Sequence, residues 1–353
     1  MRRIDGWQWL GRFALAFCLG VCGAAGAAAV PHAAGGLQIY VIDVEGGQST
    51  LFVAPGGQSL LIDTGWPGNA DRDADRIVAA AKAAGIHRID YVLLTHYHND
   101  HVGGVPQLVA RIPVGTFIDH GPNRETTSAK TEQGYELYQK VLAGKKYGHI
   151  TARPGMTLPI LGVHVEILTA DGNMIQKPLP GAGQTNNYCA ESEKRPADQT
   201  ENARSIGSLI TFGAVRILDL GDLTWDKEMQ LMCPTNRIGH VDLLIVSHHG
   251  WYQSSSPALV DAITPVVAIM DNGEIKGGSP ATLRTLHNVQ SLRAIYQLHY
   301  SKESGPLNTP TENIANIEGT DPGNYFKVTV QKNGAFTVQN SRTHAAQNYH
   351  AQP

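Results

Sequence analysis

The amino-acid sequence predicts an α/β fold, and a β-sandwich flanked by helices accommodates its order of elements. Three observations support this prediction. Residues 37–62 read as three short strands joined by Gly-containing turns. The middle of the chain then alternates strand-like apolar runs with helix-like segments. Near the end, residues 326–330 and 335–338 flank Asn333-Gly334, which predicts a final hairpin.

Each element is predicted from its local pattern. Runs rich in β-branched residues predict strands at residues 37–44, 49–54, 59–62, 91–94, 112–118, 163–168, 209–212, 215–220, 241–246 and 266–270. Helical spacing and end signals predict helices at residues 71–84, 132–143, 257–263 and 279–287, one opening at 102–106 and one closing at 229–232. The polar stretch 181–204 predicts a long loop of the kind that borders an active site.

The composition is that of an ordinary globular protein. The chain has 353 residues, of which 42% are hydrophobic, so it is long enough to bury a sizeable core in one large domain or two average ones. Its formal net charge is −3, and no run of Lys or Arg follows the N-terminus. Because a dedicated nucleic-acid binder usually carries a basic stripe, the sequence has no strong nucleic-acid signature.

The first 29 residues have the pattern of a secretory signal peptide. Arginines come first, an apolar core spans residues 13–22, and Ala27-Ala28-Ala29 offers a cleavage site. An uncleaved anchor helix is the alternative, although the apolar core is short for a membrane span. We therefore expect a periplasmic or secreted protein without a membrane span in the mature chain. Its domain would cover residues 36–340, followed by a flexible tail over residues 341–353.

Two cysteines, Cys189 and Cys233, follow the predicted signal peptide. An oxidising compartment permits a disulfide between them. Two unpaired thiols are the alternative, which the sequence alone leaves open. Neither cysteine has the spacing of a cysteine zinc site.

The stretch His96-Tyr97-His98-Asn99-Asp100-His101 holds four metal-capable side chains directly after a strand-like apolar run. In a tightly turned segment alternate residues project the same way, so His96 and His98 can point into one pocket. Asp100 and His101 can then serve a neighbouring position. This density of imidazole and carboxylate suits zinc or a similar divalent ion, with manganese or iron also compatible. The alternative is a polar loop that happens to be rich in histidine.

Four motifs along the chain resemble those of the metallo-β-lactamase superfamily of hydrolases. They are Leu60-Leu61-Ile62-Asp63-Thr64-Gly65, the histidine motif above, Leu218-Asp219-Leu220-Gly221-Asp222 and Ser247-His248-His249-Gly250. The turn Asp43-Val44-Glu45-Gly46-Gly47-Gln48 also resembles, loosely, the opening of the superfamily's competence-protein branch. The resemblance implies the metallo-β-lactamase αββα sandwich, which the predicted order of strands and helices accommodates.

The resemblance also implies roles for the motif residues. His96 and His98 would bind a first zinc ion, Asp100 and His101 a second, and Asp222 would bridge the two. In this family the aspartate at the position of Asp100 also positions the attacking water, so Asp100 is the predicted catalytic residue.

Two further assignments depend on local geometry. Successive residues on a strand face opposite ways, so only one of two adjacent histidines should reach the metal. We expect His248 to complete the second metal site and His249 to meet substrate or a carboxylate. Asp63 is interpreted as orienting a ligand histidine through its free ring N–H, the alternative being a turn residue before Gly65.

A third histidine for the first metal ion is missing from the expected pattern. Many members of the family place it at a strand end between the histidine motif and the Gly-Asp motif. The candidates are His120, His149 and His164. We expect His164, inside an alternating strand, to be structural. His120 ends a strand in Asp-His-Gly and is the candidate for contact with metal or substrate.

The resemblance implies an exported hydrolase that uses a metal-bound hydroxide on a phosphoester or phosphodiester, as a small-molecule or short ester substrate. The aspartate at position 222 resembles the phosphodiesterases and thioesterases of the superfamily, because its β-lactamases carry Cys or Ser there. Two alternatives stay open: an amide or lactone hydrolase, such as a periplasmic β-lactamase, and a metal-binding protein without catalytic activity. No residue pattern indicates the oligomeric state.

Overall fold

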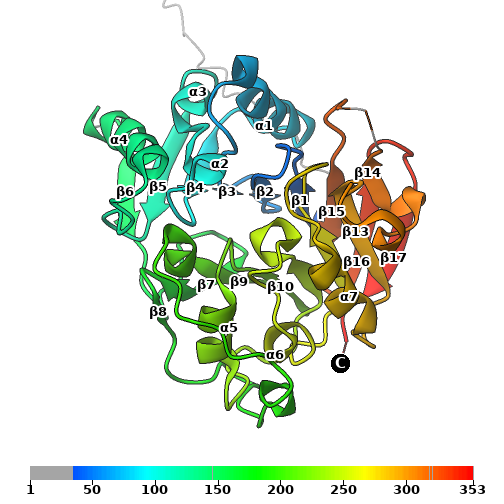
Figure 1. The fold of residues 1–353 in the computed structure, drawn as a ribbon. Coiled ribbons are helices and arrows are strands. Elements are labelled where there is room, and N and C mark those ends of the chain that lie inside the picture. Colours follow the sequence, from blue (N-terminus) through cyan, green and yellow to red (C-terminus); the bar gives the residue numbers. More distant parts are fainter. Residues whose placement is uncertain (1–34, 145, 318, 320, 353) are drawn as a thin grey trace, which may run out of the picture. The chain divides into compact units, whose positions relative to one another are not determined.

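Two β-sheets pack face to face in the computed structural model, and helices cover their outer faces (Figure 1). The structure describes residues 35–144, 146–317, 319 and 321–352, so the predicted signal peptide at residues 1–29 lies outside the described residues.

The first sheet joins the N-terminal part of the chain to its C-terminal end, in the order β17-β16-β15-β1-β2-β3-β4-β5-β6. Its strands are β1 Leu37–Val41, β2 Thr50–Val53, β3 Ser59–Ile62, β4 Ile89–Leu93, β5 Val114–Asp119, β6 Gly148–Thr151, β15 Phe326–Val330, β16 Ala335–Asn340 and β17 Ala346–His350. Pairing is parallel from β3 to β6 and antiparallel elsewhere. The carboxyl ends of β3, β4 and β5 therefore meet at one edge, and Asp63, His96 and His120 follow them there.

The second sheet has the order β14-β13-β12-β11-β10-β9-β7-β8. Its strands are β7 His164–Ala170, β8 Asn173–Met174, β9 Gly207–Phe212, β10 Val215–Asp219, β11 Leu243–Ile245, β12 Val267–Met270, β13 Ala294–His299 and β14 Ile314–Asn316. Strands β10 to β14 run parallel. Asp222 follows the carboxyl end of β10, and His248 and His249 follow that of β11.

Three apolar layers separate the sheets and helices. The helices are α1 Arg72–Ala83, α2 Asn99–Val102, α3 Val105–Val109, α4 Ala129–Ala143, α5 Trp225–Met232, α6 Pro257–Val260 and α7 Pro280–Asn288. Side chains from both sheets, such as Ile39 and Ile217, form the middle layer. The outer layers hold the apolar faces of α1 and α3 against the first sheet, and those of α5 and α7 against the second. The predicted αββα sandwich is confirmed.

The C-terminal residues differ from the prediction of a flexible tail over residues 341–353. Ala346–His350 form β17, paired antiparallel with β16 at the edge of the first sheet. Most β17 side chains are exposed, and Tyr349 packs its ring on Phe336 and places its hydroxyl 2.7 Å from that of Tyr296. A polar edge strand has no apolar alternation, so the sequence gives no signal for it.

A disulfide and side-chain hydrogen bonds attach the long segment 181–204 to the rest of the fold. Cys189 and Cys233 form a disulfide, which joins the short helix η3 (Asn187–Cys189) to the residue after α5. Nearby, the side-chain amide of Asn186 donates to the carbonyl oxygens of Met232 (3.0 Å) and Ala258 (2.7 Å). Of the helices in the described ranges, none combines the length and apolar character needed to cross a bilayer.

Candidate metal centre

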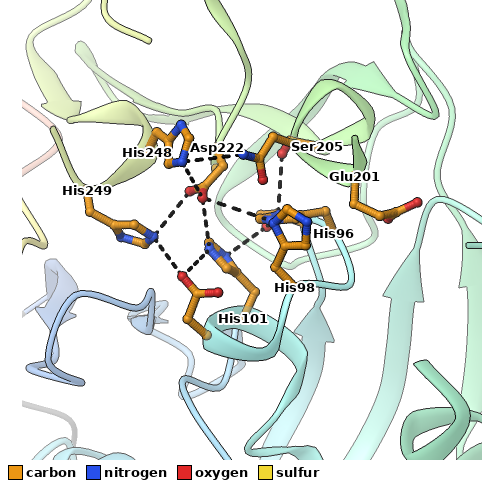
Figure 2. A network of polar contacts seen from close by, with 12 residues as sticks. His96, His98, His101, Glu201, Ser205, Asp222, His248 and His249 are labelled. Atoms are coloured by element: carbon orange, nitrogen blue, oxygen red, sulfur yellow. Dashed lines mark hydrogen bonds and ion pairs between the residues drawn. The ribbon is translucent and has the colours of Figure 1, made fainter. Parts of the chain in front are cut away.

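The motif residues of both sheets converge between the carboxyl ends of their strands (Figure 2). His96 follows β4, and His101 lies in the short helix α2. Asp222 follows β10, and His248 and His249 lie in the turn η5 (Ser247–Gly250) after β11. Residues more than 120 positions apart in the sequence therefore form one buried cluster because the strand ends of the two sheets face one another.

Asp222 occupies the centre of this cluster, with its carboxylate facing four imidazole rings (Figure 2). Its Oδ2 lies 3.3 Å from Nε2 of His101, 3.4 Å from Nε2 of His248 and 3.9 Å from Nε2 of His96. Its Oδ1 lies 3.4 Å from Nε2 of His249. A carboxylate with both oxygens directed at imidazoles on two sides has the arrangement needed to bridge two cations.

Asp100 adds a second carboxylate on one side of the cluster. Its Oδ2 lies 3.5 Å from Nε2 of His101 and 3.3 Å from Nε2 of His249. One ligand atom each from Asp100, His101, Asp222 and His249 lie within 4.8 Å of one another. Nζ of Lys276 contacts Asp100 and lies 2.6 Å from the carbonyl oxygen of Gly46, so the ammonium borders the same group.

The donor atoms of the cluster fit a metal ion. Several of them are buried and have no hydrogen-bond partner, namely Nε2 of His96, His101 and His249 and Oδ1 of Asp222. Leaving such atoms bare costs free energy. Ligands that share one zinc ion at about 2.0–2.2 Å lie roughly 3.3 Å apart in tetrahedral geometry, close to several of the separations above. The residues present therefore suit divalent cations.

Both adjacent histidines reach Asp222, whereas the strand-based argument expects only one to do so. Strand β11 ends at Ile245, and His248 and His249 follow it with left-handed φ values of 56° and 53°. The turn therefore removes the alternation of a strand. His249 is the one that also approaches Asp100, while His248 meets the side-chain amide of Asn202 at 3.4 Å.

Asp63 makes the contact that the sequence predicts for it. Its Oδ2 lies 2.7 Å from Nδ1 of His101 and accepts a 2.6 Å hydrogen bond from the hydroxyl of Thr95. Its Oδ1 accepts the backbone N–H of Thr95 at 2.8 Å. With Nδ1 held by Asp63, the ring of His101 directs Nε2 toward Asp100 and Asp222, as a ligand histidine requires.

The charges within the cluster keep its carboxylates ionised. Burial raises the pKa of Asp222, but the neighbouring His101 and His249 outweigh burial and bring that pKa well below its usual range. For Asp100, Lys276 and His101 outweigh burial in the same way, and the pKa is again well below its usual range. Burial lowers the pKa of His248 to about 4, so that ring is neutral at pH 7 and keeps a lone pair for a ligand bond.

His98 lies beside this central group. Its ring is 4.7 Å from that of His96, centroid to centroid, and its Nε2 lies 2.8 Å from Oε2 of Glu125. Glu125 also accepts the backbone N–H of Glu201 at 2.9 Å. Neither glutamate belongs to a motif; Glu125 lies in an irregular segment and Glu201 begins the short helix η4 (Glu201–Arg204), so the sequence offered no pattern by which to find them.

None of the three candidates for the missing histidine joins the cluster. His120 is buried; its Nε2 lies 2.9 Å from Oε2 of Glu201 and its Nδ1 has no hydrogen-bond partner, so its contact with metal or substrate stays a prediction. His149 pairs with Asp119 at 2.8 Å. His164 is exposed at the start of β7, 3.7 Å from Glu166. In each of the three rings, one nitrogen faces a carboxylate outside the cluster.

Lys276 is a site residue for which the sequence gives only a partial signal. The pattern Lys276-Gly277-Gly278 suggests an anion held by backbone N–H groups and the lysine charge. In the structure the N–H of Gly278 donates to the carbonyl oxygen of His249 at 2.8 Å, which removes it from this role. The lysine charge, by contrast, lies at the site.

Comparison with known proteins gives matches to one superfamily. The family model described as "Metallo-beta-lactamase superfamily" matches residues 43–174. The chain is 26% identical over 238 residues to Recombination protein 2 of Haemophilus influenzae, covering 67% of this chain and 24% of that protein. It is 26% identical over 236 residues to competence protein ComA of Neisseria gonorrhoeae, covering 67% and 27%.

A shorter match is to hydroxyacylglutathione hydrolase of Stenotrophomonas maltophilia, at 32% identity over 114 residues. It covers 32% of this chain and 40% of that enzyme. The chain thus spans less than half the length of each of these relatives.

Proposed function

We propose a phosphoesterase activity for this chain, which belongs to the metallo-β-lactamase superfamily of hydrolases. The observation that carries the proposal is Asp222, a buried carboxylate whose Oδ1 faces His249 and whose Oδ2 faces His96 as well as His101. An aspartate placed to hold two cations suits in-line displacement at phosphorus, where such cations would stabilise both the attacking and the leaving oxygen. The substrate would be a small phosphoester or phosphodiester, and zinc is the first metal to test.

The residues divide into two cation positions around Asp222. Asp100, His101 and His249 would hold one cation, and His96 and His98 would hold the other. Bound divalent cations supply a water of lowered pKa and neutralise negative charge on the phosphoryl group. Asp63 keeps the ring of His101 oriented, and Glu125 fixes the ring of His98.

Lys276 would recognise the anionic substrate. Its ammonium stands at the rim of the cluster, with the side chain 33% exposed, beside the indole ring of Trp66. Once a cation neutralises Asp100, the charge of Lys276 is free to pair with a phosphoryl oxygen. Asp100 lies where it can also orient the attacking water.

Hydrolysis of a thioester or other acyl bond is the second candidate. It is favoured by the similarity to an enzyme whose name states a hydroxyacylglutathione as its substrate. The same two cation positions would then stabilise the oxyanion of an attacked carbonyl. Amide or lactone hydrolysis, including β-lactam cleavage, would use the same site.

Substrate comparison on one sample tests these proposals. The purified chain, with its metal content measured by elemental analysis, is given bis-p-nitrophenyl phosphate, a hydroxyacylglutathione and nitrocefin. We expect two metal equivalents and preferential turnover of the phosphodiester. His101→Ala should lose turnover and His164→Ala should keep it, because His164 is an exposed histidine outside the cluster. Turnover of the thioester or nitrocefin alone would replace the phosphoesterase proposal.

We also propose that the protein is exported to the periplasm or secreted. The disulfide between Cys189 and Cys233 supports this, because such bonds persist in oxidising compartments. The signal-peptide pattern before residue 30 supports it independently. Cell fractionation with mass spectrometry of the N-terminus is the test. An uncleaved, cytoplasmic protein would refute the proposal.

A further inference from the structure

The first cation position, formed by His96 and His98 with Asp222, lacks the third histidine that the motif pattern expects. All three sequence candidates pair elsewhere, as described above. Two imidazoles and a shared carboxylate give this cation three protein ligands, whereas the second position offers four, namely Asp100, His101, His249 and Asp222. One more side-chain donor at the first position would make the two positions equal in ligand number.

Asn202 has the features of that donor. It lies in the short helix η4 (Glu201–Arg204) before β9, between the histidine motif and the Gly-Asp motif along the chain. Its side-chain nitrogen lies 3.4 Å from Nε2 of His248, which itself lies 3.4 Å from Asp222. The residue is 8% exposed, and its Oδ1 is buried without a hydrogen-bond partner. An amide oxygen so placed has its lone pairs free to bind a cation.

The surrounding contacts hold η4 against the histidine motif. The carboxylate of Glu201 accepts the backbone N–H of Tyr97 at 3.3 Å and that of Arg124 at 2.7 Å. After η4, the N–H of Ile206 donates to the carbonyl oxygen of Thr95 at 2.9 Å. The hydroxyl of Ser205 lies 3.5 Å from Nδ1 of His96 (Figure 2). Asn202 is thus fixed between two anchors that belong to the strand end bearing His96.

We infer that Oδ1 of Asn202 is a ligand of the first cation position, in place of the missing histidine. This inference rests on the metal centre of the proposed function. It has a consequence for metal choice, because imidazole favours zinc whereas amide and carboxylate oxygens suit harder cations such as Mn²⁺. The first position would therefore discriminate less strongly for Zn²⁺ over Mn²⁺ than a site completed by a third histidine.

Cation titration of the metal-free full chain tests the inference without using activity. Binding of Mn²⁺ is followed by electron paramagnetic resonance, and Zn²⁺ is added as competitor. The variants are Asn202→Ala, Asn202→Asp, which keeps an oxygen donor, and Asn202→His, which supplies the imidazole. Asn236→Ala is the matched control, because Asn236 is also 8% exposed but hydrogen-bonds only to loop backbone away from the cluster.

We expect Asn202→Ala to lower the affinity of one of the two cation positions by at least about tenfold. Loss of a residue that only orients a ligand typically costs that much or more. Asn202→Asp should restore binding, and Asn202→His should shift the preference toward Zn²⁺ by roughly tenfold or more. Asn236→Ala should leave both affinities unchanged. If Asn202→Ala does not fold by circular dichroism, the aspartate and histidine variants still decide the question.

The failures are distinguishable. A wild-type chain that binds no cation would overturn the proposed function and this inference together. Two intact binding events with unchanged affinity and unchanged metal preference in Asn202→Ala and Asn202→His would overturn only the inference. A raised KM for substrate with unchanged cation affinity would place Asn202 on the substrate instead, and would also overturn it.

Discussion

Two groups of histidine and acidic side chains, one at the metal centre and one beside the turn after β1, have similar residue types but differ in whether their polar atoms have hydrogen-bond partners. The first comprises Asp100, His101, Asp222 and His249, and the second comprises Asp43, Glu45 and His299. In the first group, ring nitrogens and a carboxylate oxygen are buried without hydrogen-bond partners.

In the second group the carboxylate of Asp43 is satisfied by the protein. Its Oδ1 lies 2.8 Å from Nε2 of His299 and accepts the N–H of Glu45 at 2.9 Å. Its Oδ2 pairs with the guanidinium of Arg76 at 2.9 Å. This group fixes the turn that carries Gly46, whose carbonyl oxygen accepts Lys276. The comparison teaches that bare donor atoms, rather than the residue types alone, distinguish a metal centre from a structural network.

The largest effect should come from removing the shared carboxylate of the first group. Asp222→Ala takes away the oxygens that face four imidazoles, so we expect phosphodiester turnover to fall by more than about 100-fold, beyond the loss of an outer-shell partner. Turnover at saturating metal is the measurement. Near wild-type activity in this variant would contradict the assignment of the first group as the metal centre.

A smaller effect should follow from Asp63→Asn, which leaves every predicted metal ligand in place. The amide cannot accept the His101 ring N–H as a carboxylate does, so metal affinity should fall by about 10–100-fold. Isothermal titration with Zn²⁺ measures this. Unchanged affinity would mean that packing alone orients His101.

The second group should respond in stability instead of metal binding. His299→Ala removes a buried partner of Asp43, and we expect the free energy of unfolding to fall by about 1–3 kcal/mol. Chemical denaturation measures that change, while elemental analysis should return the wild-type metal content. A lost metal equivalent in this variant would show that the second group is also a metal site.

A third buried carboxylate, that of Glu228, sharpens the comparison. It accepts the backbone N–H groups of Ser255 (2.8 Å) and Ser256 (2.7 Å), and burial outweighs these bonds and the nearby charge of Arg195, so its pKa rises from 4.5 to about 7. The folded state then binds the extra proton between pH 4.5 and 7, so stability should fall as pH rises through that window.

Glu228→Gln should flatten this pH dependence, by roughly 3 kcal/mol across the window. Denaturation at pH 5 and pH 8 in parallel with wild type is the measurement. An unchanged slope would assign the pH dependence to other groups, such as the carboxylates of the metal centre.

Site residues that lie close together in the sequence, or directly after a predicted strand, could be found from the sequence alone. His96, Asp100 and His101 lie in one motif, and Asp222 follows a strand that its apolar run reveals. The layers of the sandwich followed from the same alternation of strands and helices. The strand-based argument for the adjacent histidines does not hold, because two left-handed residues replace the expected strand geometry. His249 meets a carboxylate as expected, and which of the two binds a metal ion stays a prediction.

Other contributors could not be found without the fold. Glu125 comes from an irregular segment, and Glu201 and Asn202 come from the single turn η4; only tertiary packing brings them beside the histidine motif. No periodicity or spacing connects them to the histidine motif. The same holds for β17, a polar strand defined by its pairing with β16 alone.

The most direct test of the account is a crystal structure of the metal-loaded protein with anomalous diffraction data at the absorption edge of the bound metal. The account predicts two anomalous peaks flanking the carboxylate of Asp222, one toward His101 and His249 and one toward His96 and His98. It predicts no peak at Asp43, Glu45 and His299. A peak at that second group, or none beside Asp222, would contradict it.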